Sequence, residues 1–251
     1  MTFDIITIFP KIFNSYFNES IVKRARAKKL IDIRVHDLRD YAKHKKSLPA
    51  KMRSFRRVDD TPYGGGAGMV MMAEPILRAV DAVVHKNKNN KTKIVLFSAK
   101  GKSFNQKIAH DWSKKYNRIV FVTGRYEGID ERATQILKKE YKKDFEEISI
   151  GPYVLTDGDV AAMIVISAVS RLIPGAIRME SLQEESHWNM LLKTETKKLP
   201  TTNYKLQTTL EYPHYTRPEV LIYKSKKYSV PKVLLSGNHK KIAEWRKSHC
   251  S

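Results

Sequence analysis

Three short segments carry the residue types that could hold a small ligand. They are SAKGK at 98–102, TGRYEGIDER at 123–132 and SIGPYVLTDGD at 149–159. Their small residues let the backbone approach a ligand closely and offer it amide donors. Tyr126, Tyr153 and Leu155 could enclose a flat ring such as adenine. The segments therefore predict a binding site for a small molecule that contains such a ring.

The sequence lacks the patterns that are typical of several other common binding and catalytic sites. GGGAGM at 64–69 lacks the last glycine of the dinucleotide fingerprint, and no P-loop sequence occurs. One cysteine and scattered histidines offer no set of four zinc ligands. No serine or cysteine lies in a recognisable nucleophile elbow. The sequence does not support a dinucleotide, P-loop, zinc or covalent-nucleophile site.

Each of the three segments follows a short apolar run and precedes a helical pattern. The runs are 94–97, 119–122 and 148–150, and the helical patterns are 103–115, 128–139 and 158–172. This alternation predicts an α/β fold with a parallel sheet, in which ligands bind beyond the carboxyl ends of the strands. Further strands are expected at 3–9 and 31–35, with helical spacing of Phe13, Phe17 and Ile21 between them.

The periodic pattern ends after Pro174 and Gly175. A polar segment follows up to Thr209, and a short stretch with a few apolar positions closes the chain. We predict a ligand-binding domain at 1–176, a linker at 177–209 and a small, mainly helical C-terminal domain at 210–251.

The charge of the chain favours a polyanionic partner. The 47 Lys and Arg residues exceed the 26 Asp and Glu residues and give a formal charge of +21. Residues 23–57 hold 14 basic residues against three Asp, interleaved with Tyr41, His44 and Phe55. This composition suits phosphate contacts, although a solvated surface stretch would have the same composition.

Nothing in the sequence indicates a membrane protein. Asp4 interrupts the first apolar run, and the longest nearly apolar run, 160–169, is too short to span a bilayer. The single cysteine, Cys250, can form no internal disulfide. We expect a cytoplasmic protein.

Five segments together resemble the bacterial tRNA (guanine-N1)-methyltransferase family, TrmD. They are DDTPYGGGAGMVMM at 59–72, TGRYEGIDER at 123–132, SIGPYVLTDGD at 149–159, YPHYTRPEV at 212–220 and LLSGNH at 234–239. Their order and their spread over most of the chain make coincidence implausible.

The resemblance implies a SPOUT-type fold with a deep trefoil knot, an architecture so rare that pattern reading alone would not propose it. It implies a homodimer that methylates ring nitrogen 1 of the guanosine at position 37, in the anticodon stem-loop of tRNA. The cofactor would be S-adenosylmethionine, with Mg²⁺ as a further candidate. The cofactor-binding positions that match the family are Leu96, Phe97, Ser98, Ala99, Gly124, Tyr126, Glu127, Ile150, Gly151, Pro152, Tyr153, Val154, Leu155 and Gly158.

Catalytic roles also follow from the resemblance. Ring nitrogen 1 of guanine must lose a proton before it can attack, and the family uses a linker aspartate as the base. Glu185 takes that position if Ser181 matches a family serine four residues ahead of the aspartate. Glu184 is a neighbouring candidate, and an ungapped comparison would place Ser186 there, although serine is a poor base near neutral pH.

Arg171 matches the family arginine that stabilises charge on the guanine oxygen, although it could instead complement the end of its helix. Ser181 and Arg217 match substrate-binding positions. The resemblance also implies that residues 1–176 form a knotted, S-adenosylmethionine-binding methyltransferase domain, that 177–209 form a flexible interdomain linker and that the small C-terminal domain at 210–251 binds tRNA. Pro152 and Asp157 depart from the family, which usually has an acidic or amide residue and a glycine there. Asp157 adds negative charge near the cationic sulfonium.

Two other functions remain open at this point. A knotted methyltransferase could act on ribosomal RNA or a ribose hydroxyl, although RYEGIDER and YPHYTRP argue against it. An RNA-binding protein of the same fold could have lost methyltransferase activity, in which case neither Glu184 nor Glu185 would affect turnover.

Overall fold

The computed structural model describes residues 1–42, 56–85, 91–178 and 212–249. The chain divides into two compact units, Met1–Arg178 and Met179–Ser251. The predicted linker at 177–209 falls almost entirely outside the described residues. Each unit is treated by itself below.

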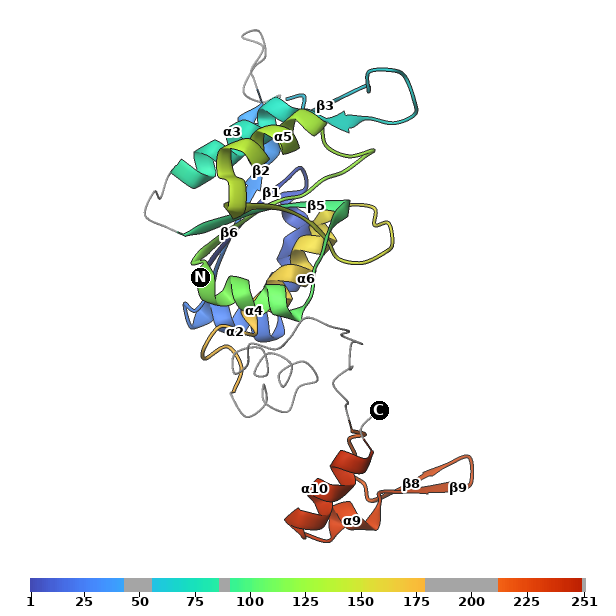
Figure 1. Ribbon diagram of the computed structural model, residues 1–251. Helices are drawn as coiled ribbons and strands as arrows, with labels where there is room; N and C mark the ends of the chain where they lie inside the picture. Colours follow the sequence, from blue (N-terminus) through green and yellow to red (C-terminus); the bar gives the residue numbers. More distant parts are fainter. Residues whose placement is uncertain (43–55, 86–90, 179–211, 250–251) are drawn as a thin grey trace, which may run out of the picture. The chain divides into compact units, whose positions relative to one another are not determined.

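A five-stranded parallel sheet forms the centre of the first unit (Figure 1). Its strands are β1 (Thr2–Thr7), β2 (Asp32–Asp37), β5 (Thr92–Ser103), β6 (Arg118–Val122) and β7 (Phe145–Ser149), in the order β2-β1-β6-β5-β7. Every pairing between neighbouring strands is parallel. Each of the five predicted strands is present, and the predicted α/β class with a parallel sheet is confirmed.

Helices cover both faces of this sheet (Figure 1). One face carries η1 (Pro10–Phe13), α1 (Asn14–Phe17), α2 (Ser20–Ala27), α4 (Gln106–Lys115) and α6 (Gly158–Ser170). Phe13 and Phe17 are buried there against Phe3 and Ile5 of β1, together with Trp112. The predicted helical spacing of Phe13, Phe17 and Ile21 thus falls in three short helices, η1, α1 and α2, instead of one.

The other face carries η2 (Leu38–Tyr41), α3 (Ala73–His85), α5 (Glu131–Tyr141) and η4 (Lys142–Asp144). Sequence reasoning missed α3. Its buried positions Ile76, Ala79, Val80 and Val83 follow the three- and four-residue spacing of an amphipathic helix, a signal that was available in the sequence.

The second unit is small and mostly exposed. It holds a hairpin of β8 (Val220–Tyr223) and β9 (Lys226–Ser229), followed by α9 (Lys232–Leu235) and α10 (His239–Ser248). Trp245 packs edge-on against Tyr215, with ring centres 6.2 Å apart, and stacks on His249. The unit was predicted to be small and mainly helical, and the hairpin was not part of that prediction.

Candidate functional site

A cavity of about 530 Å³ lies at the carboxyl ends of β5, β6 and β7. The small-residue segment within β5 and the two segments that follow β6 and β7 all contribute to its wall. Parallel strands place their carboxyl ends at one edge of a sheet, which is why segments far apart in the sequence meet there. Of the fourteen predicted cofactor positions, those that line the cavity are Leu96, Phe97, Ser98, Ala99, Gly124, Tyr126, Glu127, Ile150, Gly151, Tyr153, Val154, Leu155 and Gly158.

Pro152 is the exception. Its side chain is exposed, and the residue does not line the cavity, unlike its neighbours Gly151 and Tyr153. A proline also has no N–H to offer a ligand. A role for Pro152 in cofactor binding therefore stays a prediction, without support from the lining of this cavity.

Twelve lining residues were not predicted individually. Most belong to the same three segments or to the strand ends, so their neighbours already signalled them, whereas Glu131, Thr134 and Ala161 lie on the helices that follow. The twelve are Lys100, Arg125, Gly128, Ile129, Glu131, Thr134, Glu147, Ile148, Ser149, Thr156, Asp157 and Ala161.

The first wall of the cavity is an outward loop within β5. Ile148 of β7 pairs with both Phe97 and Lys102, so residues 98–101 leave the ladder and β5 then resumes. A Cβ on Gly101 would lie 2.7 Å from backbone atoms of Ile148. Only glycine allows this close approach, which places Ser98 and Ala99 at the cavity.

The second wall, the segment after β6, is held by a small hairpin of β3 (Asp59–Asp60) and β4 (Val70–Met71). The Glu127 amide donates to the Met69 carbonyl at 3.0 Å, and the Met71 amide donates to the Gly128 carbonyl at 2.9 Å. Tyr126 has a left-handed φ of 60°. Burial and a hydrogen bond to Asp59 raise the pKa of Tyr126. The hairpin thus fixes the turn that carries Tyr126 and Glu127.

The third wall, between β7 and α6, is braced by its own side chains. The Tyr153 hydroxyl donates to the Ile150 carbonyl at 3.1 Å, and its ring lies where a Cβ on Gly151 would clash at 2.3 Å. The Gly158 amide donates to the Gly124 carbonyl at 2.8 Å, which joins this wall to the second one.

Asp157 is the N-cap of α6 and is only 9% exposed. Its Oδ1 accepts from the amides of Asp159 at 2.9 Å and Val160 at 3.2 Å. Its Oδ2 accepts from the Arg125 guanidinium at 3.1 Å and from the Thr156 hydroxyl at 3.0 Å. The extra negative charge noted in the sequence is therefore paired with Arg125, whose guanidinium also lies 4.2 Å from the centre of the Phe9 ring.

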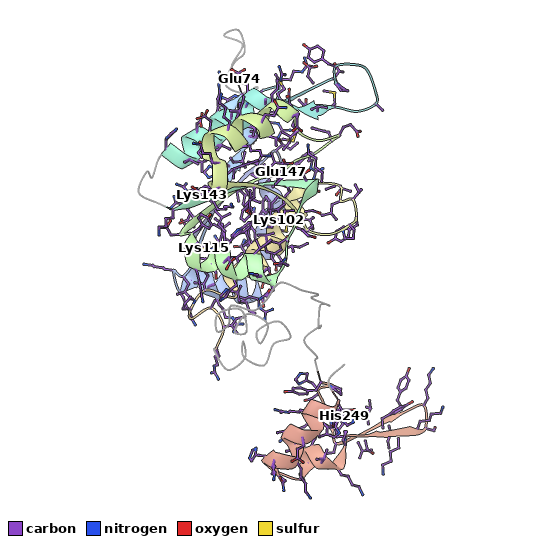
Figure 2. All side chains as sticks on the ribbon, viewed as in Figure 1. Glu74, Lys102, Lys115, Lys143, Glu147 and His249 are labelled. Carbon is purple, nitrogen blue, oxygen red and sulfur yellow. The ribbon has the colours of Figure 1, made fainter. Side chains whose placement is uncertain are left out.

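The cavity lining is acidic although the chain is strongly basic. It contains four carboxylates, Glu127, Glu131, Glu147 and Asp157, against the two cations Lys100 and Arg125, a net charge of −2 in a chain of +21. Lys100 pairs with Glu131 at 2.7 Å. Glu147, labelled in Figure 2, has a buried Oε2 atom without a hydrogen-bond partner among the described residues. Such a lining favours a ligand with positive charge and hydrogen-bond donors over a phosphate.

Of the predicted catalytic residues, Arg171 is described, and it does not line the cavity of its own chain. Arg171 is the C-cap of α6, whereas the cavity lies at the first turn of that helix. The 13 residues of α6 separate the two by roughly 20 Å at 1.5 Å per residue. Glu184, Glu185 and Ser181 lie outside the described residues, and Arg217 is exposed in the second unit.

Two features are absent from the part of the chain that the structure describes. No three or more His, Cys, Asp or Glu side chains gather there in a group that could hold a metal ion. No helix there has the length and the apolar composition needed to cross a membrane.

Comparison with known proteins agrees with the pattern of segments. The family model described as tRNA (Guanine-1)-methyltransferase TrmD matches residues 1–251. A protein of Thermomicrobium roseum named tRNA (guanine-N(1)-)-methyltransferase is 45% identical over 247 residues, which cover 98% of this chain and 78% of that protein. A protein of the same name from Clostridioides difficile is 42% identical over 248 residues, covering 98% of this chain and 91% of that protein. On the whole-chain match and these identities, the chain belongs to the TrmD family of tRNA (guanine-N1)-methyltransferases.

Proposed function

We propose that this protein transfers a methyl group from S-adenosylmethionine to ring nitrogen 1 of the guanosine at position 37 of tRNA, 3′ of the anticodon. Family membership over the whole chain supports the reaction. The observation that carries the proposal at the level of residues is the acidic, glycine-rich cavity of a strongly basic chain. A basic exterior suits a polyanionic RNA, and an acidic pocket suits a cationic cofactor.

The residues of the cavity fit S-adenosylmethionine. Its volume of about 530 Å³ is typical of small-molecule sites. Tyr126, Tyr153 and Leu155 offer faces for the adenine ring, and Glu127 and Glu147 offer carboxylates to the amino group and the sulfonium. When bound, the cofactor supplies an electrophilic methyl group on a positively charged sulfur. The cavity residues bind and orient it, and the walls exclude water from it.

The substrate side of the reaction needs a base and a stabilised oxyanion. We assign the base to Glu185, which would remove the proton from ring nitrogen 1, with Glu184 as the neighbouring candidate and Ser181 as a substrate contact. As that proton leaves, negative charge builds on the exocyclic oxygen of guanine. Arg171 would stabilise this negative charge in the transition state.

The active enzyme is proposed to be a homodimer. Arg171 lies at the far end of α6 from the cavity of its own chain, which supports a role for it at the cavity of a second copy. Each cavity would then be completed by the linker and the C-terminal unit of the partner, and an isolated chain would be inactive. The deep trefoil knot of the SPOUT fold belongs to the same proposal and is supported by family membership. Cytoplasmic localisation follows from the tRNA substrate.

A resident Mg²⁺ ion draws no support from the residues that the structure describes, because they include no group of ligands able to hold it. No step is therefore assigned to a metal. Sensitivity of the reaction to a chelator would show whether methyl transfer requires Mg²⁺.

The test is methyl transfer from labelled S-adenosylmethionine to an unmodified tRNA transcript with guanosine at position 37. We expect robust activity for the wild type, loss of activity for Glu185→Ala and retention of activity for Glu185→Asp. A matched transcript with adenosine at position 37 should accept no label. Tight cofactor binding without any wild-type transfer would overturn the proposal and leave an RNA-binding protein.

A further inference from the structure

The β8–β9 hairpin of the second unit is exposed at all eight of its strand positions. Val220, Leu221, Ile222, Tyr223 and Tyr228 all rank among the exposed large hydrophobic residues, and Ile222 is 72% exposed. Figure 2 shows side chains projecting from both sides of the hairpin. A two-stranded hairpin is marginally stable alone, and apolar patches of this kind usually mark binding surfaces. The hairpin is therefore a surface in need of a partner.

The strand register divides the hairpin into two different faces. Leu221 pairs with Tyr228 and Tyr223 pairs with Lys226, so these four side chains share one face, called here the tyrosine face. Val220, Ile222, Lys227 and Ser229 form the opposite face. Tyr223 and Tyr228 are diagonal neighbours across the two strands, about 7–8 Å apart, and are 59% and 53% exposed.

The charge of the residues around the hairpin indicates which kind of partner would bind there. Residues 212–249 contain nine Lys and Arg against two Glu, a net charge of +7. The hairpin itself carries Lys224, Lys226 and Lys227 and no acidic residue. Cores of protein interfaces are depleted of lysine, whereas aromatic rings interleaved with lysine suit single-stranded nucleic acid.

The turn places a lysine at the tip. Lys224 and Ser225 have φ angles of 47° and 61°, the left-handed pair that a two-residue hairpin turn requires. Asparagine and glycine usually fill these positions, and strained residues of this kind gather at functional sites. Lys224 Nζ lies 5.6 Å from the centre of the Tyr223 ring, which keeps a cation beside the aromatic platform.

We propose that the tyrosine face is a stacking platform for unpaired bases of the tRNA substrate, with the hairpin lysines on the flanking phosphates. Unpaired loop bases are recognised by stacking on aromatic side chains of a sheet surface, and Tyr223 and Tyr228 offer two such rings. Arg217, exposed just before β8, would extend the phosphate contacts. This inference rests on the proposed function for its choice of RNA.

The first test measures binding of the unmodified tRNA transcript to the full chain by fluorescence anisotropy. We expect the double variant Tyr223→Ala/Tyr228→Ala to weaken binding by at least about tenfold, and Tyr223→Phe/Tyr228→Phe to bind like the wild type. The matched control is Val220→Ala/Ile222→Ala, which removes two apolar side chains from the opposite face and should change affinity less than about twofold. The affinity for S-adenosylmethionine should stay unchanged in all three.

A second measurement tests the phosphate contact without touching the tyrosines. Lys224→Asn keeps a residue that favours the turn, and it should reduce the slope of log affinity against log salt by about 0.7–0.9. Equal losses on both faces, or unchanged binding in the alanine variant of the tyrosine face, would overturn the proposal. The proposal would also be overturned if the alanine variant of the tyrosine face changed the sedimentation of the protein and left its tRNA affinity unchanged. That result would mean that the face contacts a second copy of the chain.

The inference and the proposed function can fail separately. If the wild type methylates tRNA and the tyrosine variants bind it normally, the platform is wrong and the enzyme stands. If the wild type transfers no methyl group and the tyrosine variants still lose tRNA binding, the platform stands and the proposed function fails.

Discussion

The carboxylate of Asp157 has two roles: it caps α6, and it forms an ion pair with Arg125 at the cavity wall. A glycine, which the family resemblance leads us to expect at this position, has no side chain to pair with Arg125 or to accept from the first amides of α6. Without Asp157, the Arg125 guanidinium would lie beside the site of a cationic ligand with only its longer ion pair to Asp159, at 3.9 Å, to offset its charge. The carboxylate should therefore favour the binding of a positively charged cofactor.

We expect Asp157→Asn to weaken S-adenosylmethionine binding by roughly tenfold, because it removes one negative charge at the cavity while keeping a capping side chain. S-adenosylhomocysteine has a neutral sulfur and should lose much less affinity. Isothermal titration with both ligands checks the prediction, and equal losses for the two would show that the charge of Asp157 is not the cause. Asp157→Ala should in addition lower the free energy of unfolding by about 1 kcal/mol through loss of the cap.

Asp4 is a fully buried carboxylate in β1. It accepts hydrogen bonds from Arg118 Nε and His36 Nε2, both at 2.7 Å. Burial alone would raise the pKa of Asp4, but the hydrogen bonds and charges of His36 and Arg118 outweigh burial and hold the pKa below its usual value. A lowered carboxyl pKa adds stability above the unfolded-state value, near 4, and this stability is lost as the pH falls through the folded-state value.

Replacing Asp4 with Asn should lower the free energy of unfolding at pH 7 by about 2–4 kcal/mol, since a buried charged partner of Arg118 is removed. The difference from the wild type should shrink as the pH falls below about 4. Urea unfolding at pH 7, 5, 4 and 3 measures both effects. Asp32→Asn is the matched control, because its pair with Arg34 is half-exposed and should change stability by less than about 1 kcal/mol.

At the residue scale, the sequence predicted the cavity wall well because the family motifs fall in continuous segments. It predicted Tyr126 and Glu127 but not Glu147, since a glutamate inside a strand pattern has no local signal of facing a cavity. The ion pair between Asp157 and Arg125 could not be predicted from the sequence either. The two residues lie 32 positions apart, and only the folding of the sheet brings them together.

At the scale of elements, the loop within β5 depends on Gly101. The loop at 98–101 leaves and rejoins the ladder at Ile148, so the backbones of β5 and β7 are in direct contact at this glycine. Backbone atoms cannot rotate out of the way as the end of a side chain can. A methyl group at Gly101 must therefore move the loop or part the strands.

We expect Gly101→Ala to reduce stability by about 1–3 kcal/mol and to weaken S-adenosylmethionine binding, because it shifts Ser98 and Ala99 at the cavity. The control is Gly124→Ala, where the new Cβ would meet only the Ile129 side chain at an ordinary distance of 3.5 Å. Thermal unfolding of both variants decides the matter. Equal stability of the two would show that β5 and β7 can part without cost at this point.

Sequence patterns fixed the type of most elements but not their ends. The 94–97 run was predicted to end at the loop, whereas β5 continues to Ser103, since pairing with β7 resumes only in three dimensions. The helix α3 was not predicted, although the apolar spacing of residues 73–85 is regular and typical of an amphipathic helix.

At the scale of the whole molecule, the sequence predicted an open parallel sheet from the alternation of strands and helices. Its strand order, β2-β1-β6-β5-β7, could not be derived in the same way. Local periodicity carries no information about which strands become neighbours. Because knotted chains are rare, sequence patterns alone do not lead to the prediction of a knot. Family resemblance supplied the expectation of a knot and of a dimer.

A shared active site has a consequence that can be measured by mixing two inactive chains. Arg171→Ala removes the group expected to reach the partner's cavity, whereas Ala99→Trp fills the cavity from an exposed position in the β5 loop. Each variant alone should show almost no methyl transfer, because every site in a symmetric dimer then contains the defect. In a mixed dimer, however, both defects fall in one site and the other site is complete.

Random pairing of equal amounts of the two chains makes half of the dimers mixed, each with one complete site of two, so activity should recover to about a quarter of the wild-type rate. The chains would be co-expressed with different tags, so that the mixed dimer can be purified and should reach about half of the wild-type rate. Two copies of Arg171→Ala with different tags provide the control for purification. The purified mixed dimer could instead stay inactive although each chain still binds tRNA. Arg171 and the cavity would then have to act within one chain, and the distance between them along α6 would have to close during the reaction.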